Sequence, residues 1–259
     1  MINIQTIEQK FKEYIARYNP NNARVKLKID HIQRVAKNSE LIAKNLNLSP
    51  EQIQLAIAIG FFHDIGRFEQ VKIANTFSDK ESGINHAALG ITVLFQDQLI
   101  KEFIPETRQY DTIIQKAVFN HNKTQLENDL SEEELLFCKI IRDADKLDIF
   151  YILSDEAYTM ESIFWYSNFD SPEISEKIMQ ALQNKSSIDY SWVHTNGDVV
   201  AIFYGYLYNL YFPISKDIIL QNNYLEKFTN RVLQAFLSPR IHEQVKSLFV
   251  MTTEYLKSS

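Results

Sequence analysis

Apolar side chains recur at helical intervals along most of this 259-residue chain. An amphipathic helix is predicted near the start by the spacing of Ile7, Phe11, Tyr14, Ile15 and Tyr18. Residues 19–22, which include a proline and three asparagines, indicate a loop. A second helix follows, with apolar positions from Leu27 to Leu46. The chain therefore begins with two helices that each bury one face.

The third predicted helix is apolar almost all round, which is typical of a central element. Ser49 as N-cap, Pro50 in the first turn and Gln52 closing a capping box mark its start. It runs from Ile53 to Phe62 and delivers an adjacent imidazole and carboxylate, those of His63-Asp64. Burying such a pair is costly unless another group compensates it, and a metal ion would do so.

The later pattern alternates between regular and irregular stretches. Periodicity fades between Gly66 and Gly83, where residues 75–79 are expected to form a loop over the candidate site, as a lid or a mere connection. Further helices are predicted at 85–95, from Pro105 to about 120, from a capping box at 131–134 through Phe150, and at about 216–237 and 240–257.

Composition supports an all-α fold, because only six glycines and six prolines are present and a chain rich in turns would need more. We expect one domain over residues 1–259, with a metal-binding core at about 24–155 and a helical C-terminal extension at about 156–259. The aromatic stretch Phe203–Phe212 is expected to be core or the face of a homodimer.

Net charge and targeting signals limit which binding partners and which cellular location are expected. The formal net charge of −6 argues against binding to nucleic acid or to an anionic membrane, although local cations can still hold a small anionic substrate. The single cysteine, Cys138, fits a reducing compartment and excludes an internal disulfide. The first residues do not resemble a signal peptide, and no apolar run reaches the roughly 18–20 residues of a membrane span. We therefore expect a cytoplasmic location.

A set of imidazoles and carboxylates lies at or near the ends of the predicted helices. The candidate ligands are His31, His63, Asp64, His86, His121 and Asp145. This mixture of nitrogen and oxygen donors suits Fe, Mn, Co, Ni or Zn better than Ca or Mg alone. Four imidazoles and two carboxylates suffice for two divalent ions with one bridging carboxylate. His194 and His242 have no such partners in the pattern.

The order His…His-Asp…His…His…Asp resembles the HD-domain superfamily of metal-dependent phosphohydrolases. The resemblance runs from Lys28 to Tyr151 and is carried by the following segments: Asp30-His31, His63-Asp64-Ile65-Gly66, Asn85-His86-Ala87-Ala88-Leu89-Gly90, Asn120-His121-Asn122 and Asp143-Ala144-Asp145-Lys146-Leu147-Asp148. It implies an all-α HD-domain helical bundle with the helical C-terminal part as an extension.

The resemblance also assigns roles to the ligands. His31, His63, Asp64 and Asp145 would hold one divalent ion, and Asp64 would bridge to a second ion completed by His86 and His121. Fe, Mn, Co, Ni, Zn and Mg are the candidate ions. Asp145 is preferred over Asp143 because it precedes Lys-Leu, as the aspartate of the family does; Asp143 or Asp148 is expected to orient a ligand imidazole instead.

The implied reaction is hydrolysis of a phosphate ester or anhydride by a metal-bridging hydroxide. Asp64 would act as the catalytic bridge, and Arg67 and Lys146 are expected to take part in catalysis by clamping the phosphoryl oxygens. Lys72 is a further candidate for substrate binding, and the alternative for Arg67 is an ion pair with Glu69 or Glu81. No organic cofactor is expected.

The substrate would be a small phosphorylated molecule, such as a nucleotide. Several branches of the superfamily fit poorly: Ile149 and Leu153 replace the tyrosine and aspartate of the triphosphohydrolases, and Arg67 replaces the glutamate of a 5′-nucleotidase branch. Two alternatives remain open at this point. One is a di-iron oxygenase, which uses the same six ligands in another branch, and the other is a non-catalytic metal-binding or sensor module.

Overall fold

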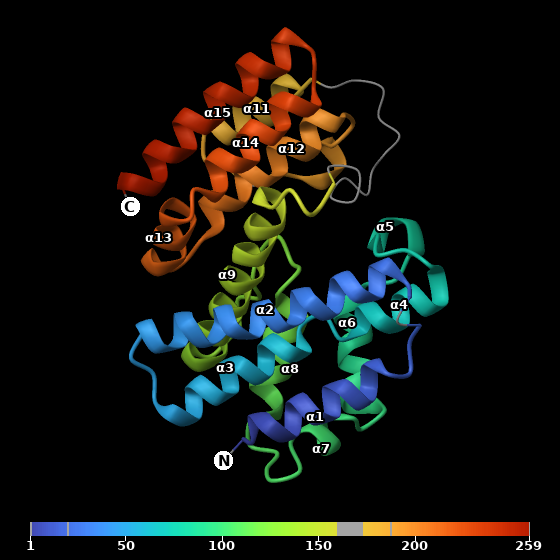
Figure 1. The fold of residues 1–259 in the computed structure, drawn as a ribbon. Helices are drawn as coiled ribbons and strands as arrows, with labels where there is room; N and C mark the ends of the chain where they lie inside the picture. Colours follow the sequence, from blue (N-terminus) through green and yellow to red (C-terminus); the bar gives the residue numbers. More distant parts are fainter. Residues whose placement is uncertain (1, 20, 160–172, 187, 259) are drawn as a thin grey trace. The chain divides into compact units, whose positions relative to one another are not determined.

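The computed structural model describes residues 2–19, 21–159, 173–186 and 188–258, and the regular elements in them are helices (Figure 1). The prediction of an all-α fold is confirmed. The chain forms two compact units, Met1–Asp148 and Ile149–Ser259. The boundary expected near residue 155 lies close to this division; the assignment of the whole chain to a single domain stays a prediction.

The first unit contains the helices that carry the candidate ligands. In chain order they are α1 (Ile4–Ile15), α2 (Ala23–Asn45), α3 (Pro50–Phe62), α4 (Gly66–Ala74), α5 (Asp79–Ser82), α6 (His86–Ile91), the π-helical turn η1 (Thr92–Gln96), α7 (Ile100–Phe103), α8 (Asp111–Asn120) and the start of α9 (Glu132–Ser154). The capping box predicted at Ser49 and Gln52 is present at the start of α3.

Aromatic packing fixes α1 against α3 and α4. The ring of Phe11 lies 5.5 Å from that of Phe61 and 6.1 Å from that of Phe68, in edge-to-face geometry. Tyr14 meets Phe68 in the same way at 5.9 Å. Such pairs add about 0.5–1.5 kcal/mol each beyond the burial of their area. They hold in place the two helices that flank His63 and Asp64.

Two glycines allow the helices around His63-Asp64 to approach closely. A Cβ atom on Gly60 would lie 2.5 Å from the Cα of Ala36, so α2 and α3 pack backbone to backbone. A Cβ atom on Gly66 would lie 2.2 Å from the carbonyl oxygen of His86 and 2.5 Å from the nitrogen of Gly90. The contact at Gly66 brings α4 against α6. These contacts draw the helices that carry His31 and His86 toward the central pair.

The expected irregular stretch from Gly66 to Gly83 is largely helical, because it holds α4 and α5. The apolar period is hidden here because a buried position of α4 is Gln70, whereas Ile73 is 64% exposed. The buried glutamine is satisfied by hydrogen bonds to Asp79, Ser82 and Ile84. Tertiary contacts therefore stabilise α4 without an amphipathic stripe.

The helix expected to begin at Pro105 begins instead at Asp111. The residue before a proline is disfavoured in the helical region, and Ile104 adopts φ −131° and ψ 76°, which ends α7. The guanidinium of Arg108 donates to the carbonyl oxygen of Ile104 and closes the turn that follows. Proline here terminates a helix rather than starting one.

The second unit contains helices from the last part of the chain. They are α11 (Glu176–Gln183), the 3-10 turn η2 (Tyr190–Trp192), α12 (Asn196–Tyr206), the 3-10 turn η3 (Leu207–Asn209), α13 (Pro213–Gln221), α14 (Tyr224–Ala235) and α15 (Pro239–Ser258). The single helix expected at about 216–237 is divided between α13 and α14, where Asn223 adopts the left-handed conformation with φ 53°.

Polar anchors organise the second unit. The buried carboxylate of Asp198 accepts hydrogen bonds from the backbone N–H groups of Ser175 at 2.7 Å, His194 at 3.0 Å and Thr195 at 3.2 Å. Tyr204, in the aromatic stretch, is fully buried, and its hydroxyl bonds that of Thr229 at 2.7 Å. At least this part of the stretch is core.

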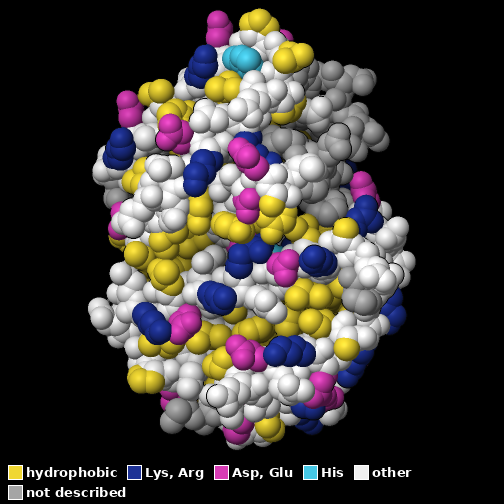
Figure 2. Space-filling model, viewed as in Figure 1, with side chains coloured by type: hydrophobic (Ala, Val, Ile, Leu, Met, Phe, Trp, Pro, Cys, Tyr) yellow, Lys and Arg dark blue, Asp and Glu magenta, His cyan; other side chains and the backbone are white. Residues whose placement is uncertain are grey.

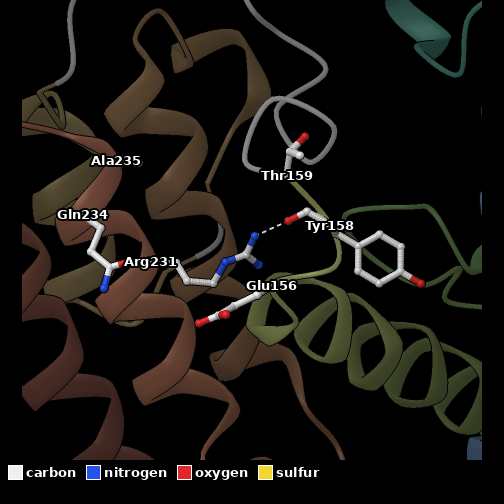
Figure 3. A pocket seen from close by; sticks show the side chains of 6 residues that line it. All are labelled: Glu156, Tyr158, Thr159, Arg231, Gln234 and Ala235. Carbon is white, nitrogen blue, oxygen red and sulfur yellow. Dashed lines mark hydrogen bonds between the residues drawn. The ribbon is translucent and has the colours of Figure 1, made fainter.

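Arg231 on α14 closes the end of α9 within the second unit. It donates to the carbonyl oxygen of Leu153 at 2.6 Å and to that of Tyr158, the contact drawn in Figure 3. A pocket of about 270 Å³ adjoins it, lined by Glu156, Tyr158, Thr159, Arg231, Gln234 and Ala235. Because the guanidinium already satisfies the carbonyls that a helix leaves open at its C-terminus, its role here is structural.

None of the described helices combines the length and the apolar character needed to cross a membrane. Figure 2 shows basic and acidic side chains interspersed over one face of the molecule. The expected exclusion of nucleic-acid and membrane partners, the cytoplasmic location and the homodimer stay predictions.

We predict that Gly66→Ala destabilises the first unit by about 1–3 kcal/mol, because the new methyl group must displace backbone atoms of α6. The matched control is Gly90→Ala on the other side of the same contact. A Cβ atom there meets the nitrogen of Gly66 at an ordinary 3.5 Å, and alanine favours the helix, so little stability is lost. Urea denaturation measures both; equal losses in the two variants would contradict the packing argument.

Candidate metal centre

The six predicted ligands lie in the first unit and come together as two clusters. In each cluster the candidate ligand atoms lie within 4.8 Å of one another. The first cluster is His31, His63 and Asp145, and the second is Asp64, His86 and His121. The side chains come from α2, α6 and α9 and from the residues just after α3 and α8. All except Asp145 are buried.

Asp64 faces both clusters through different oxygen atoms. Its Oδ2 lies 3.5 Å from His31 Nε2 and 3.7 Å from His63 Nε2. Its Oδ1 lies 3.3 Å from His86 Nε2 and 3.6 Å from His121 Nε2. Each oxygen therefore points into one cluster, which is the arrangement a bridging carboxylate needs.

Two of the imidazoles are oriented by the backbone. His63 Nδ1 lies 2.8 Å from the carbonyl oxygen of Gly60, and His121 Nδ1 lies 2.6 Å from that of Val118. Both carbonyls are in the last turn of a helix, where carbonyl groups lack intrahelical partners. Because a carbonyl can only accept, Nδ1 must carry the proton in each ring, and Nε2 of the neutral ring is left with a free lone pair.

The other two imidazoles are oriented by carboxylates. His31 Nδ1 lies 2.7 Å from Asp148 Oδ2, and His86 Nδ1 lies 2.7 Å from Asp79 Oδ2. Of the two aspartates considered for this role on α9, Asp148 makes the contact with His31. Asp79 was not predicted. A carboxylate that accepts from Nδ1 fixes the ring and makes Nε2 a stronger metal ligand.

The chemistry of these donors fits divalent cations. His31 Nε2 lies 3.2 Å from His63 Nε2, and His86 Nε2 lies 3.0 Å from His121 Nε2. In each pair the two Nε2 atoms thus face one another beside a carboxylate oxygen. A metal ion in each cluster would be coordinated by these nitrogens.

The pKa values of two of the four imidazoles favour the neutral ring that a metal ligand needs. Burial lowers the pKa of His63 to about 3, and burial with the nearby charge of Arg67 lowers that of His86 to about 4. Both rings are therefore neutral near pH 7, as a ligand must be. Burial and Lys28 oppose protonation of His31, but its three carboxylate neighbours raise its pKa to about 10. The negative charge of these carboxylates also attracts a metal cation.

Both carboxylates are ionised, although Asp64 is buried and the Asp145 side chain is only 21% exposed. Burial acts to raise the pKa of Asp64, but Lys28 and the surrounding imidazoles hold it well below the ordinary value. The pKa of Asp145 is likewise lowered against the effect of burial, chiefly by His31. Ionised carboxylates among imidazoles supply the charge that a metal centre requires.

Lys28 is a feature of the site that the sequence reasoning missed. Its Nζ lies 2.5 Å from Asp64 Oδ2, and its side chain is 17% exposed. It stands three residues before His31 on α2, so that both side chains lie on the same face of the helix. This spacing from a predicted ligand is the signal that could have identified it.

The three basic residues predicted to contact substrate lie in different surroundings. Arg67 Nε is 3.4 Å from Asp64 Oδ1, and its Nη1 donates to Asp79 at 2.7 Å. Its ion-pair partners are thus Asp64 and Asp79 rather than Glu69 or Glu81. Lys146 is buried and donates to the carbonyl oxygen of Arg142 at 3.2 Å. Burial lowers its pKa to about 8. Their roles in substrate binding stay predictions.

Lys72 lies on the exposed side of α4. Its side chain is 64% exposed and pairs with Glu69 at 3.3 Å. His194 and His242 lie in the second unit, and neither belongs to a metal-type cluster of the described residues. The segment 75–79 leads into α5, which contributes Asp79 to the centre.

Comparison with known proteins agrees with this geometry. Residues 29–149 match the family model described as the HD domain. No curated protein and no solved structure matches the chain. The matched segment includes the six candidate ligands. Residues 29–149 are thus similar to the HD domain, and the resemblance that the motifs predicted is confirmed for this segment.

Proposed function

We propose that this protein is a phosphohydrolase that uses two divalent ions to cleave a phosphate ester or anhydride of a small molecule. The observation that carries the proposal is the position of Asp64, with one oxygen directed at each of two ligand clusters. With Asp64 shared, one ion would have four protein ligands and the other three, which leaves open positions for water and substrate on ions that take five or six ligands. Fe, Mn, Co, Ni, Zn and Mg are the candidate ions.

Two bound ions would supply an acidified water and would neutralise charge on the phosphoryl oxygens. The protein contributes fixed ring orientations, since each of the four imidazoles has its Nδ1 engaged by a carbonyl or carboxylate. Burial excludes bulk water from five of the six ligand side chains and strengthens electrostatic interactions there.

Lys28 and Arg67 are the cations best placed to receive an anionic substrate. Both approach Asp64, at 2.5 Å and 3.4 Å, from side chains that are 17% and 16% exposed. An ammonium and a guanidinium can bind separate phosphoryl oxygens, and the guanidinium can bind two at once. The exposed Lys72 pairs with Glu69, and the buried Lys146 donates to the carbonyl oxygen of Arg142, so Lys28 takes precedence over them in this proposal.

We predict that the metal-loaded protein releases phosphate from a phosphate ester and that Asp64→Asn reduces the rate at least about 100-fold. The amide removes the negative charge that faces both clusters. A screen of nucleotides, dinucleotides and sugar phosphates with Mn²⁺ under anaerobic conditions identifies a substrate. Asp30→Asn is the matched control, because this carboxylate adjoins His31 in sequence but belongs to neither cluster. It should retain the parental rate.

The same experiment separates the competing functions. Turnover that requires both iron and O₂, without anaerobic phosphate release, would assign the centre to an oxygenase. A metal-loaded protein with no turnover under either condition would favour a sensor or binding module. Either result would overturn the phosphohydrolase proposal.

A second prediction concerns Lys28. Lys28→Met should raise KM for the phosphate substrate about 10-fold or more, because a charge-assisted hydrogen bond contributes about 1.5–3 kcal/mol. Steady-state kinetics measures the effect. Lys26→Met removes an exposed cation from the same helix and should leave KM unchanged. Equal effects of the two substitutions would indicate a general loss of charge rather than a contact of Lys28 with substrate.

A further inference from the structure

The two clusters of the centre are built alike. In each cluster, one imidazole is oriented by an aspartate that also accepts a hydrogen bond from an arginine. Arg34 Nη2 donates to Asp148 Oδ2 at 3.1 Å, and the same oxygen lies 2.7 Å from His31 Nδ1. In the other cluster, Arg67 Nη1 donates to Asp79 Oδ1 at 2.7 Å, and Asp79 Oδ2 lies 2.7 Å from His86 Nδ1.

The supports of the two aspartates differ. Asp148 lies on α9, a helix of 23 residues, and its side chain is 1% exposed. Asp79 begins α5, a helix of four residues of which none is buried, and its side chain is 33% exposed. Elements with few buried apolar contacts open at a lower free energy than core helices. The ligand shell around His86 therefore has the weaker support.

Polar contacts to α4 hold α5 in place, and Asp79 is their centre. The buried amide of Gln70 donates to Asp79 Oδ1 at 2.8 Å, to Ser82 Oγ at 3.1 Å and to the carbonyl oxygen of Ile84 at 3.1 Å. Arg67 donates to the same Asp79 oxygen and to the carbonyl oxygen of Phe77. The carboxylate thus fastens α5 through Oδ1 and orients His86, whose Nδ1 lies 2.9 Å from Oδ1 and 2.7 Å from Oδ2.

We infer that Asp79 is a positioning residue for the ion held by Asp64, His86 and His121, and that this ion exchanges more readily than the ion near His31. This inference rests on the proposed two-ion centre. Outer partners of ligand histidines typically change metal affinity by about 10- to 100-fold. Displacing α5 would withdraw the partner of His86 while leaving Asp148 and Arg34 in place around His31.

Titration of the metal-free full-length protein with Co²⁺ tests the inference, with visible absorption and calorimetry as readouts. The parental chain should bind two equivalents, the second more weakly. In Asp79→Asn, which keeps the size of the side chain, the second equivalent should weaken about 10- to 100-fold while the first keeps its affinity and spectrum. The unchanged first equivalent also reports that the variant is folded.

Two further variants sharpen the result. Glu81→Gln removes a charge from the same helix, where Glu81 accepts from Thr76 Oγ1 at 2.7 Å, and it should bind both equivalents as the parent does. His121→Ala removes a ligand of the second cluster. The absorption spectrum of its remaining equivalent should match that of the tight equivalent in Asp79→Asn, which assigns the weakened ion to the cluster with His86.

Each remaining outcome of the titration would refute a specific part of the inference. Two equivalents of parental affinity in Asp79→Asn would refute the role of Asp79 and leave the two-ion centre standing. Equal weakening of both equivalents would show a structural role without selectivity and would refute the inference as well. A single equivalent in the parental chain would overturn the two-ion centre itself, and this inference with it.

Discussion

The structure of the first unit depends on one electrostatic constraint: a buried carboxylate and the Nε2 atoms of four imidazoles converge on a small volume. Asp64 is 4% exposed, and its oxygens lie 3.3–3.7 Å from four Nε2 atoms. Leaving such a group without a partner costs several kcal/mol, so compensation has to come from cations. Lys28 and Arg67 supply part of it from the protein itself, and the remaining donor geometry is that of a metal centre.

The surrounding fold meets this constraint through helix ends and close helix contacts. His63 and His121 follow directly after α3 and α8, where side chains can turn inward and use the last open carbonyls. Gly60 and Gly66 flank the central pair and remove the Cβ atoms that would otherwise separate α3 from α2 and α4 from α6. The position of the ligands is thus a result of backbone packing as much as of ligand identity.

Much of this arrangement could be predicted from sequence. The six candidate ligands, which the structure brings together, were found because each belongs to a short motif in a fixed order, and the capping box at Ser49 marked the start of the central helix correctly. Asp79 could not be found in the same way. It precedes His86 by seven residues across a turn, in a stretch whose buried glutamine hides the helical period. Lys28 was missed although its spacing from His31 was available.

Other differences arise from tertiary context. Pro105 carries a local preference that fits the start of a helix, but the hydrogen bond from Arg108 to Ile104 selects a turn instead. Whether Arg67 pairs with Glu69, Glu81 or Asp79 depends on where α5 lies, which no local rule specifies. Sequence patterns could not predict these contacts, because they depend on how the loops bring the residues together in space.

The carbonyl partners of His63 and His121 have a consequence for how the site tolerates mutation. A substitution can remove a side-chain partner, but every residue retains its carbonyl group, so changes at Gly60 or Val118 leave the acceptor of Nδ1 in the chain. The tautomer of two of the four imidazoles is therefore fixed by backbone carbonyl oxygens, which no substitution removes. The vulnerability of the ligand shell to point mutation is concentrated in the other two, whose orientation depends on the identity of a single aspartate each.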